Sequence, residues 1–311
     1  MQYLIHIGIV IGIYTILAVS LNLVAGYTGL LSIAHAAFYG IGAYTLALMA
    51  LNLETPFWIN CLSATILAGF IGLIVGIPAL QTRGDYFTIA TFGFQVILFN
   101  IFNNWVDLTR GPMGLTGIPQ PSLWDWQIST PLEFLFLTYA IGIPVLGIAY
   151  RIVNSPFGRV LKAIREDEIF ALLLGKNVFA YKITIFVVGA MMAAIAGCLY
   201  ASYVTFIDPT SFTVTESIFI ISIVIVGGAG NLWGSIVGAI FLIALPELLR
   251  FLGLPITLAA NIRQIFYGSL LIAFMLWRPQ GLLGEFFLQT RERYDKRKIK
   301  FFSFRKSIKE L

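Results

Sequence analysis

The stretch ITIFVVGAMMAAIAGCLYASYVTF, residues 183–206, contains no Asp, Glu, Lys or Arg. A helix that crosses the hydrocarbon core of a bilayer needs about 20 predominantly apolar residues, and this stretch is long enough. Similar runs recur along most of the chain, so that 59% of its 311 residues are hydrophobic and only 11% are charged. A typical soluble domain has about 25% charged residues. The sequence therefore predicts an all-α fold, a polytopic transmembrane helical bundle.

The apolar runs mark about eight to nine membrane spans, and glycines interrupt some of them. Gly26 lies in the very short connection between the first two runs, and three glycines within 227–230 end the seventh. Glycines in such places are typical of broken helices that line a substrate path. We therefore expect broken helices near a substrate path. The candidate spans are residues 3–25, 29–50, 57–80, 86–104, 131–150, 183–206, 214–229, 231–250 and 263–277.

The positions of the basic residues predict which loops are cytoplasmic. Residues 1–82 contain no Lys or Arg, whereas the segment 151–182 contains six and the tail 278–311 contains ten. Both basic segments are expected inside the cell, and the number of crossings between them then places 105–130 and the N-terminus outside. This topology and anionic lipid account for the net charge of +5, so we expect a lipid bilayer and no nucleic acid as partner.

Small residues recur at every fourth position in several of the apolar runs. Gly230, Gly234 and Gly238 form the clearest series. Small residues at this spacing let two helix backbones approach closely in lipid, where burial from water no longer drives association. We expect these three glycines to lie at a helix–helix contact.

The chain lacks the motifs of several enzyme classes. It contains no GxxxxGK[ST] phosphate loop, no HExxH and no GxSxG. Its two histidines, His6 and His35, cannot form a histidine-rich metal site, and Cys61 and Cys198 have neither metal-ligand spacing nor a CxxC partner. We therefore expect no enzyme activity in this chain, with no catalytic residue, no metal site and no cofactor of its own.

The predicted cytoplasmic segment 155–182 has the signals of a short amphipathic helix. Ser155 is suited to cap the helix, Pro156 to occupy its first turn and Gly175 to end it. A basic and acidic cluster is followed by the apolar residues 169–174. Two interpretations stay open at this point: a helix that docks in a groove of a partner, or a solvated loop between two spans.

The same segment resembles the cytoplasmic coupling loop of ABC importer permeases. Residues 168–175, EIFALLLG, fit the pattern Glu-x-Ala-Ala-x-x-x-Gly except that Phe170 replaces the first alanine. Several further stretches resemble branched-chain amino-acid permeases, and the M-type subunit of that family in particular. These stretches are residues 22–29, 31–44, 83–87, 111–119, 227–231 and 278–282.

The resemblance implies a permease subunit of an ABC importer that moves branched-chain or other neutral amino acids across the inner membrane. The expected partners are a second homologous permease, two cytoplasmic ATP-binding subunits that hold ATP and Mg, and an extracytoplasmic substrate-binding protein. Residues 1–284 would form the permease domain and 285–311 a basic cytoplasmic tail. Contact with the ATPases would fall on Arg159, Lys162, Arg165, Glu166, Asp167, Glu168, Ala171 and Gly175.

Two other functions stay open beside this one. A permease for urea or short amides belongs to the same broad class of importer. A secondary transporter would be expected to carry ionisable residues in mid-span, and the predicted spans are nearly free of them.

Polar residues within the spans are candidates for the translocation path, because polar side chains in a membrane usually face a cavity or a partner. Interhelical hydrogen bonding, or packing in the case of the histidine, would explain them as well. The candidates are Asn22, Ser32, His35, Gln95, Asn100 and Glu216.

Overall fold

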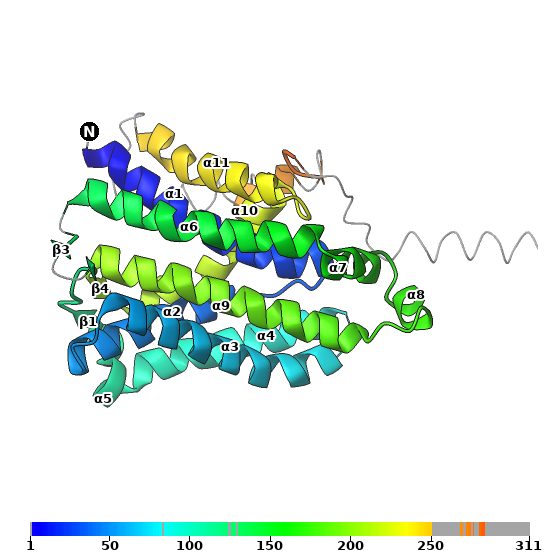
Figure 1. Ribbon diagram of the computed structural model, residues 1–311, viewed down its shortest axis with the longest axis horizontal. Coiled ribbons are helices and arrows are strands. Elements are labelled where there is room, and N and C mark those ends of the chain that lie inside the picture. Colours follow the sequence, from blue (N-terminus) through cyan, green and yellow to red (C-terminus); the bar gives the residue numbers. More distant parts are fainter. Residues whose placement is uncertain are drawn as a thin grey trace, which may run out of the picture.

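A computed structural model describes residues 2–82, 84–123, 126–128, 130–250, 268–269, 272–274, 276 and 280–283, and shows an elongated bundle of helices (Figure 1). The long helices are α1 (Gln2–Leu21), α2 (His35–Asn52), α3 (Phe57–Gln81), α4 (Asp85–Asn104), α6 (Pro131–Asn154), α9 (Val178–Val204), α10 (Val214–Gly227) and α11 (Leu232–Arg250). The short helical segments are η1 (Asn22–Gly26), α5 (Val106–Thr109), η2 (Gly111–Met113), α7 (Pro156–Glu166), α8 (Glu168–Leu173) and η3 (Pro209–Phe212). Two antiparallel ribbons pair β1 (Leu115–Thr116) with β4 (Phe206–Ile207) and β2 (Ser122–Leu123) with β3 (Trp126–Gln127).

Five helices of the described part are long and apolar enough to cross a bilayer. They cover Gln2–Gly26, Phe57–Gln81, Tyr86–Asn104, Pro131–Asn154 and Val178–Val204. Helices α10 and α11 form a sixth candidate only as a pair, bent by 118° at the break between them. The chain is thus an all-α polytopic membrane protein.

The expected count of eight to nine spans is not confirmed. α2 begins at His35 and not at residue 29, because residues 29–34 are irregular. α10 has 14 residues, which at 1.5 Å per residue is about 21 Å and shorter than a hydrocarbon core. Most of the expected span 263–277 and the whole tail 285–311 lie outside the described residues.

The two ends of the bundle carry different structures (Figure 1). The ribbon of β1 and β4 and the short helix α5 lie at one end, and α7 and α8 lie at the other. The register Leu115↔Ile207 brings the segment after α4 to the same end as the segment after α9. The charge pattern requires this arrangement, because it assigns 105–130 and 155–182 to opposite sides of the membrane.

Helix α2 is largely buried and packs against α9 through residues that lack a large side chain. A Cβ on Gly42 would meet the backbone of Ala194, and a Cβ on Gly197 would meet the backbone of Tyr39 and Ala43. Close backbone approach of this kind gives van der Waals contact along both helices, which is a main source of helix association in lipid. The helices α9 and α2 therefore form a tightly packed pair.

The predicted glycine series 230, 234 and 238 divides into two roles. A Cβ on Gly234 would lie 2.6 Å from the carbonyl oxygen of Gly227, and one on Gly238 would lie 2.9 Å from the Cα of Gly227. These two glycines pack α11 against α10, as predicted. Gly230 precedes α11, has a φ of +85° that favours glycine, and closely approaches Gly26 of η1, where a Cβ would lie 2.5 Å from the Gly230 nitrogen.

We expect Gly238→Leu to destabilise the chain by about 2 kcal/mol, because the new side chain would push α11 off the backbone of α10. Thermal unfolding in detergent measures the effect. Gly147→Leu is the matched control: Gly147 is exposed on α6 and a Cβ there has no atom within 4 Å. Equal losses in the two variants would contradict the assigned contact.

Candidate functional site

The segment predicted to be one amphipathic helix is two helices, α7 and α8, separated by Asp167. Asp167 has an extended backbone, with φ −154° and ψ 107°, and its Oδ1 accepts hydrogen bonds from the backbone N–H of Ile169 (2.9 Å) and Phe170 (3.1 Å). A carboxylate in this position satisfies donors that the first turn of a helix leaves free. The prediction of a single helix was therefore wrong, since Asp167 ends one helix and caps the next.

Both predicted ends of the segment are confirmed. Ser155 Oγ accepts a hydrogen bond from Gly158 N at 3.3 Å, with Pro156 in the first turn. At the other end Gly175 has a φ of +73°, its N–H donates to Leu172 O, and the N–H of Lys176 donates to Ala171 O. This pair of bonds is a Schellman motif, for which glycine is the favoured residue.

A small buried cluster fixes α8 to the bundle. Ala171 is buried with Ile164 of α7 and Val178 of α9. Lys182 of α9 forms an ion pair with Glu168 at 2.7 Å. Contacts with α7 and α9 therefore set the position of α8. The face of α8 that points away from these two helices is left exposed among the described residues.

That opposite face is apolar and exposed. Leu173 has 79% of its side chain exposed, more than any of its apolar neighbours in the segment. The neighbours are Ile169, Phe170, Leu172 and Leu174. Arg159, Glu166 and Asp167 are exposed on the same segment, and so is Gly175. Large exposed apolar patches with a polar rim mark protein or membrane contacts. We name the five apolar residues the α8 face.

Basic residues of α7 connect this segment to the end of the first span. Arg165 Nη1 donates a hydrogen bond to the carbonyl oxygen of Gly26, and the ammonium group of Lys162 lies 5.6 Å from the ring centroid of Tyr27. Gly26 ends η1, a π-helical turn in which the N–H of Tyr27 bonds to Asn22 O. π-Helical turns within helices are frequent at functional sites. The segment 155–182 is thus tied to the π-helical turn at the end of the first span.

Asn22 ties the same turn to the break between α10 and α11. Its Oδ1 accepts from Gly230 N at 2.8 Å, and its Nδ2 donates to Asn231 O at 2.8 Å and Ser235 Oγ at 2.6 Å. Asn231 in turn donates to Leu283 O at 2.7 Å. The predicted path residue Asn22 is therefore a buried junction of three segments.

Three other predicted path residues also lie in the packed interior. Gln95 donates to Phe212 O at 2.7 Å and accepts from Ala37 N at 2.6 Å. A ring nitrogen of His35 lies 3.1 Å from Ser20 Oγ, and Ser32 Oγ accepts from a backbone N–H two residues on. All three are 0–1% exposed. The structure thus places His35 and Gln95 in contacts between segments of the chain, and Ser32 in a local turn.

Glu216, in the first turn of α10, accepts a hydrogen bond from the hydroxyl of Tyr14 at 2.5 Å. The next residue, Ser217, donates a hydrogen bond to Gln95 Oε1 at 3.3 Å and accepts one from the backbone N–H of Ala36 at 3.1 Å. The first turn of α10 therefore belongs to the same group of buried contacts as Gln95 and the start of α2.

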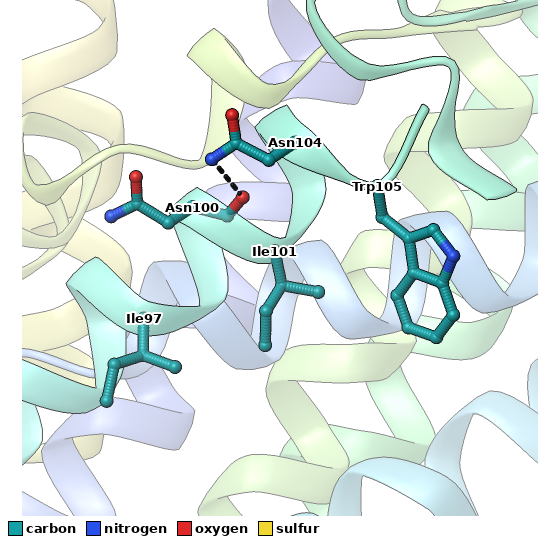
Figure 2. Close-up of a pocket in the computed structure, with 5 residues that line it drawn as sticks. All are labelled: Ile97, Asn100, Ile101, Asn104 and Trp105. Atoms are coloured by element: carbon teal, nitrogen blue, oxygen red, sulfur yellow. Dashed lines mark hydrogen bonds between the residues drawn. The ribbon is translucent and has the colours of Figure 1, made fainter. Parts of the chain in front are cut away.

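Asn100 is the one predicted path residue that is exposed in a groove (Figure 2). The groove measures about 590 Å³ and is lined by Ile97, Asn100, Ile101, Asn104 and Trp105. Figure 2 shows the carboxamides of Asn100 and Asn104 side by side and the indole of Trp105 beyond them. The spacing of the two asparagines predicts that they share one face of the helix. Nothing in the sequence predicts that Trp105 lines the same groove.

Comparisons with known proteins agree on one family. The family described as "Branched-chain amino acid transport system / permease component" matches residues 3–275. The high-affinity branched-chain amino acid transport system permease protein LivM of Escherichia coli is 35% identical over 87% of this chain and 68% of its own length. The probable LivM of Methanocaldococcus jannaschii is 28% identical over 88% and 91% of the two chains. LivH of E. coli is 27% identical over 89% and 93%. No solved structure matches the chain.

Proposed function

This chain belongs to the family of branched-chain amino acid transport system permease components, and from that premise we propose that it carries branched-chain or other neutral amino acids across the inner membrane as one of two permease subunits. The observation that supports this function best is the α8 face. A short helix that is held by buried contacts and presents five apolar side chains outward is suited to sit in a groove of a partner.

We propose that two cytoplasmic ATP-binding subunits provide that groove, one for each permease. Transport permease components are not enzymes themselves, and the described residues contain no group of three or more His, Cys, Asp or Glu that could hold a metal ion. ATP and Mg would therefore be bound by these partners. Arg159, Glu166 and Asp167 would form the polar rim of the contact.

The other permease would be a homologue, since both LivM and LivH proteins match this chain. An extracytoplasmic binding protein would deliver the amino acid to the end that carries β1 and β4. The segment 155–182 and the tail 285–311 would be cytoplasmic, and the N-terminus outside. In this topology α2 is a buried span. Helix α10 enters the bilayer and α11 leaves it on the same side. Eight to nine segments then enter the bilayer.

The contacts of α7 suggest how motion of the ATPases reaches the membrane. Displacement of α8 would move α7, and the bond from Arg165 would carry the displacement to Gly26. Gly26 packs beside Gly230, which is bonded to Asn22. The π-helical turn at Gly26 and the break between α10 and α11 would therefore respond together, which suits a rigid-body change of access between the two sides.

Reconstitution tests this function. The chain, a second permease, two ATP-binding subunits and a binding protein are placed in proteoliposomes, and uptake of labelled leucine is measured with and without ATP. We expect uptake that requires ATP and the binding protein. Uptake of leucine by the chain alone under an ion gradient would contradict the proposal.

A further inference from the structure

The amino-acid path requires a polar surface that is open to a substrate, and one exposed helix face provides it. We propose that this face of α4 lines the path of an apolar amino acid in the half of the membrane nearest β1 and β4, with a second permease chain as the opposite wall. The proposal rests on the proposed function, because it presupposes two permease subunits. The α4 face consists of Gly93, Ile97, Asn100, Ile101, Asn104 and Trp105.

The α4 face differs from the exposed faces of the other long helices around it. The exposed residues of α3 between Trp58 and Ile77 are all apolar, and so are those of α6 between Phe136 and Tyr150. Faces of that kind suit lipid. The α4 face instead carries two exposed carboxamides. Polar side chains in spans face protein or water, because hydrocarbon offers them no hydrogen-bond partner.

The carboxamide oxygens of the α4 face are available to accept hydrogen bonds. Asn100 Nδ2 donates to Val96 O at 2.8 Å, and Asn104 Nδ2 donates to Asn100 O at 2.9 Å, the bond drawn in Figure 2. Within the described part of the chain, no donor reaches either Oδ1 atom. These two oxygens can accept hydrogen bonds from an ammonium group. A second group of the substrate, its aliphatic side chain, would find apolar contacts at Ile97, Ile101 and Trp105.

The groove is also incomplete. Its lining comes entirely from α4 and the residue that follows it, Trp105, so within the described residues it has one wall. A substrate passing along a single wall would stay in contact with lipid on its other side, which a zwitterion cannot tolerate. A second chain on this side closes the groove.

Gly93 provides a test that leaves the fold intact. A Cβ at Gly93 has no atom within 4 Å, and the same holds for Gly147 on the apolar face of α6. A tryptophan at either position would project outward from this chain without a clash inside it. We expect Gly93→Trp to lose nearly all ATP-dependent leucine uptake by the complete complex in proteoliposomes, through a blocked path or a displaced second permease. Gly147→Trp should transport like the unmodified complex.

Thiol labelling gives an independent readout. Cys61 and Cys198 are first replaced by alanine, and Asn100→Cys and Ile143→Cys are then introduced separately. Ile143 is 64% exposed on α6, so the pair compares two exposed positions. In the complete complex a membrane-impermeant thiol reagent should modify Asn100→Cys at least about tenfold faster than Ile143→Cys, because thiolates form only where water reaches them. Excess leucine should slow the modification of Asn100→Cys alone.

The outcomes separate this inference from the proposed function. Normal uptake by Gly93→Trp, or equal labelling of the two cysteines, beside an active unmodified complex would overturn the assignment of the α4 face alone. An unmodified complex that takes up no amino acid would overturn the proposed function and this inference with it. Loss of uptake in Gly93→Trp, with Gly147→Trp active and Asn100→Cys protected by leucine, supports the assignment.

Discussion

Leu173→Asp is expected to abolish co-purification of the ATP-binding subunits while the membrane bundle stays folded. Leu173 is 79% exposed in the α8 face, so a carboxylate there costs the isolated chain little. In the complex the same carboxylate would be buried against apolar groups without a counter-ion. Loss of the leucine contact and burial of the charge together weaken docking by about 3 kcal/mol or more, which is at least a hundredfold in affinity.

The measurement is the amount of ATP-binding subunit retained on the tagged permease pair after purification in detergent. Met113→Asp is the control, because Met113 is 84% exposed in η2 at the opposite end of the bundle. It introduces the same charge at an exposed apolar residue and should leave ATPase retention unchanged. Retention that falls equally in both variants, or in neither, would contradict the assignment of the α8 face.

The ends of the helical segment 155–175 could be predicted because their signals are local. Ser155, Pro156 and Gly175 act through their own backbone positions and through hydrogen bonds that span three to five residues. The division at Asp167 was missed, although Asp is a favoured helix cap. Between two glutamates, Glu166 and Glu168, an aspartate looks like one more solvated residue, and only the backbone geometry shows that it ends α7.

The environment of the polar residues could not be predicted, because the decisive contacts join distant parts of the chain. Asn22 and Gly230 are 208 positions apart, and Gln95 and Phe212 are 117 apart. An apolar helix has no contrast between a buried and an exposed face in its sequence, so periodicity does not tell whether such a side chain faces a neighbour or a cavity. The same limit affects α10. Its residues are as apolar as those of a full span, but the helix is shorter than a full span.

Asn22→Ala is expected to destabilise the chain by about 2 kcal/mol. It removes three hydrogen bonds, each worth about 0.6 kcal/mol between membrane helices, and it leaves the N–H of Gly230 buried without that acceptor. Thermal unfolding of the purified chain in detergent measures the loss. Asn154→Ala is the matched control, because Asn154 is exposed at the end of α6 and donates only to Tyr150 O, one turn away on its own helix.

A second effect of Asn22→Ala follows from its position between the coupling segment and the break at Gly230. Motion that Arg165 passes to Gly26 would no longer be passed to α11 through Asn22, since those bonds are absent. We therefore expect the complete complex to hydrolyse ATP while leucine uptake per ATP falls well below that of the Asn154→Ala complex. A variant that loses stability but keeps its full uptake per ATP would show that Asn22 holds the three segments together without taking part in coupling.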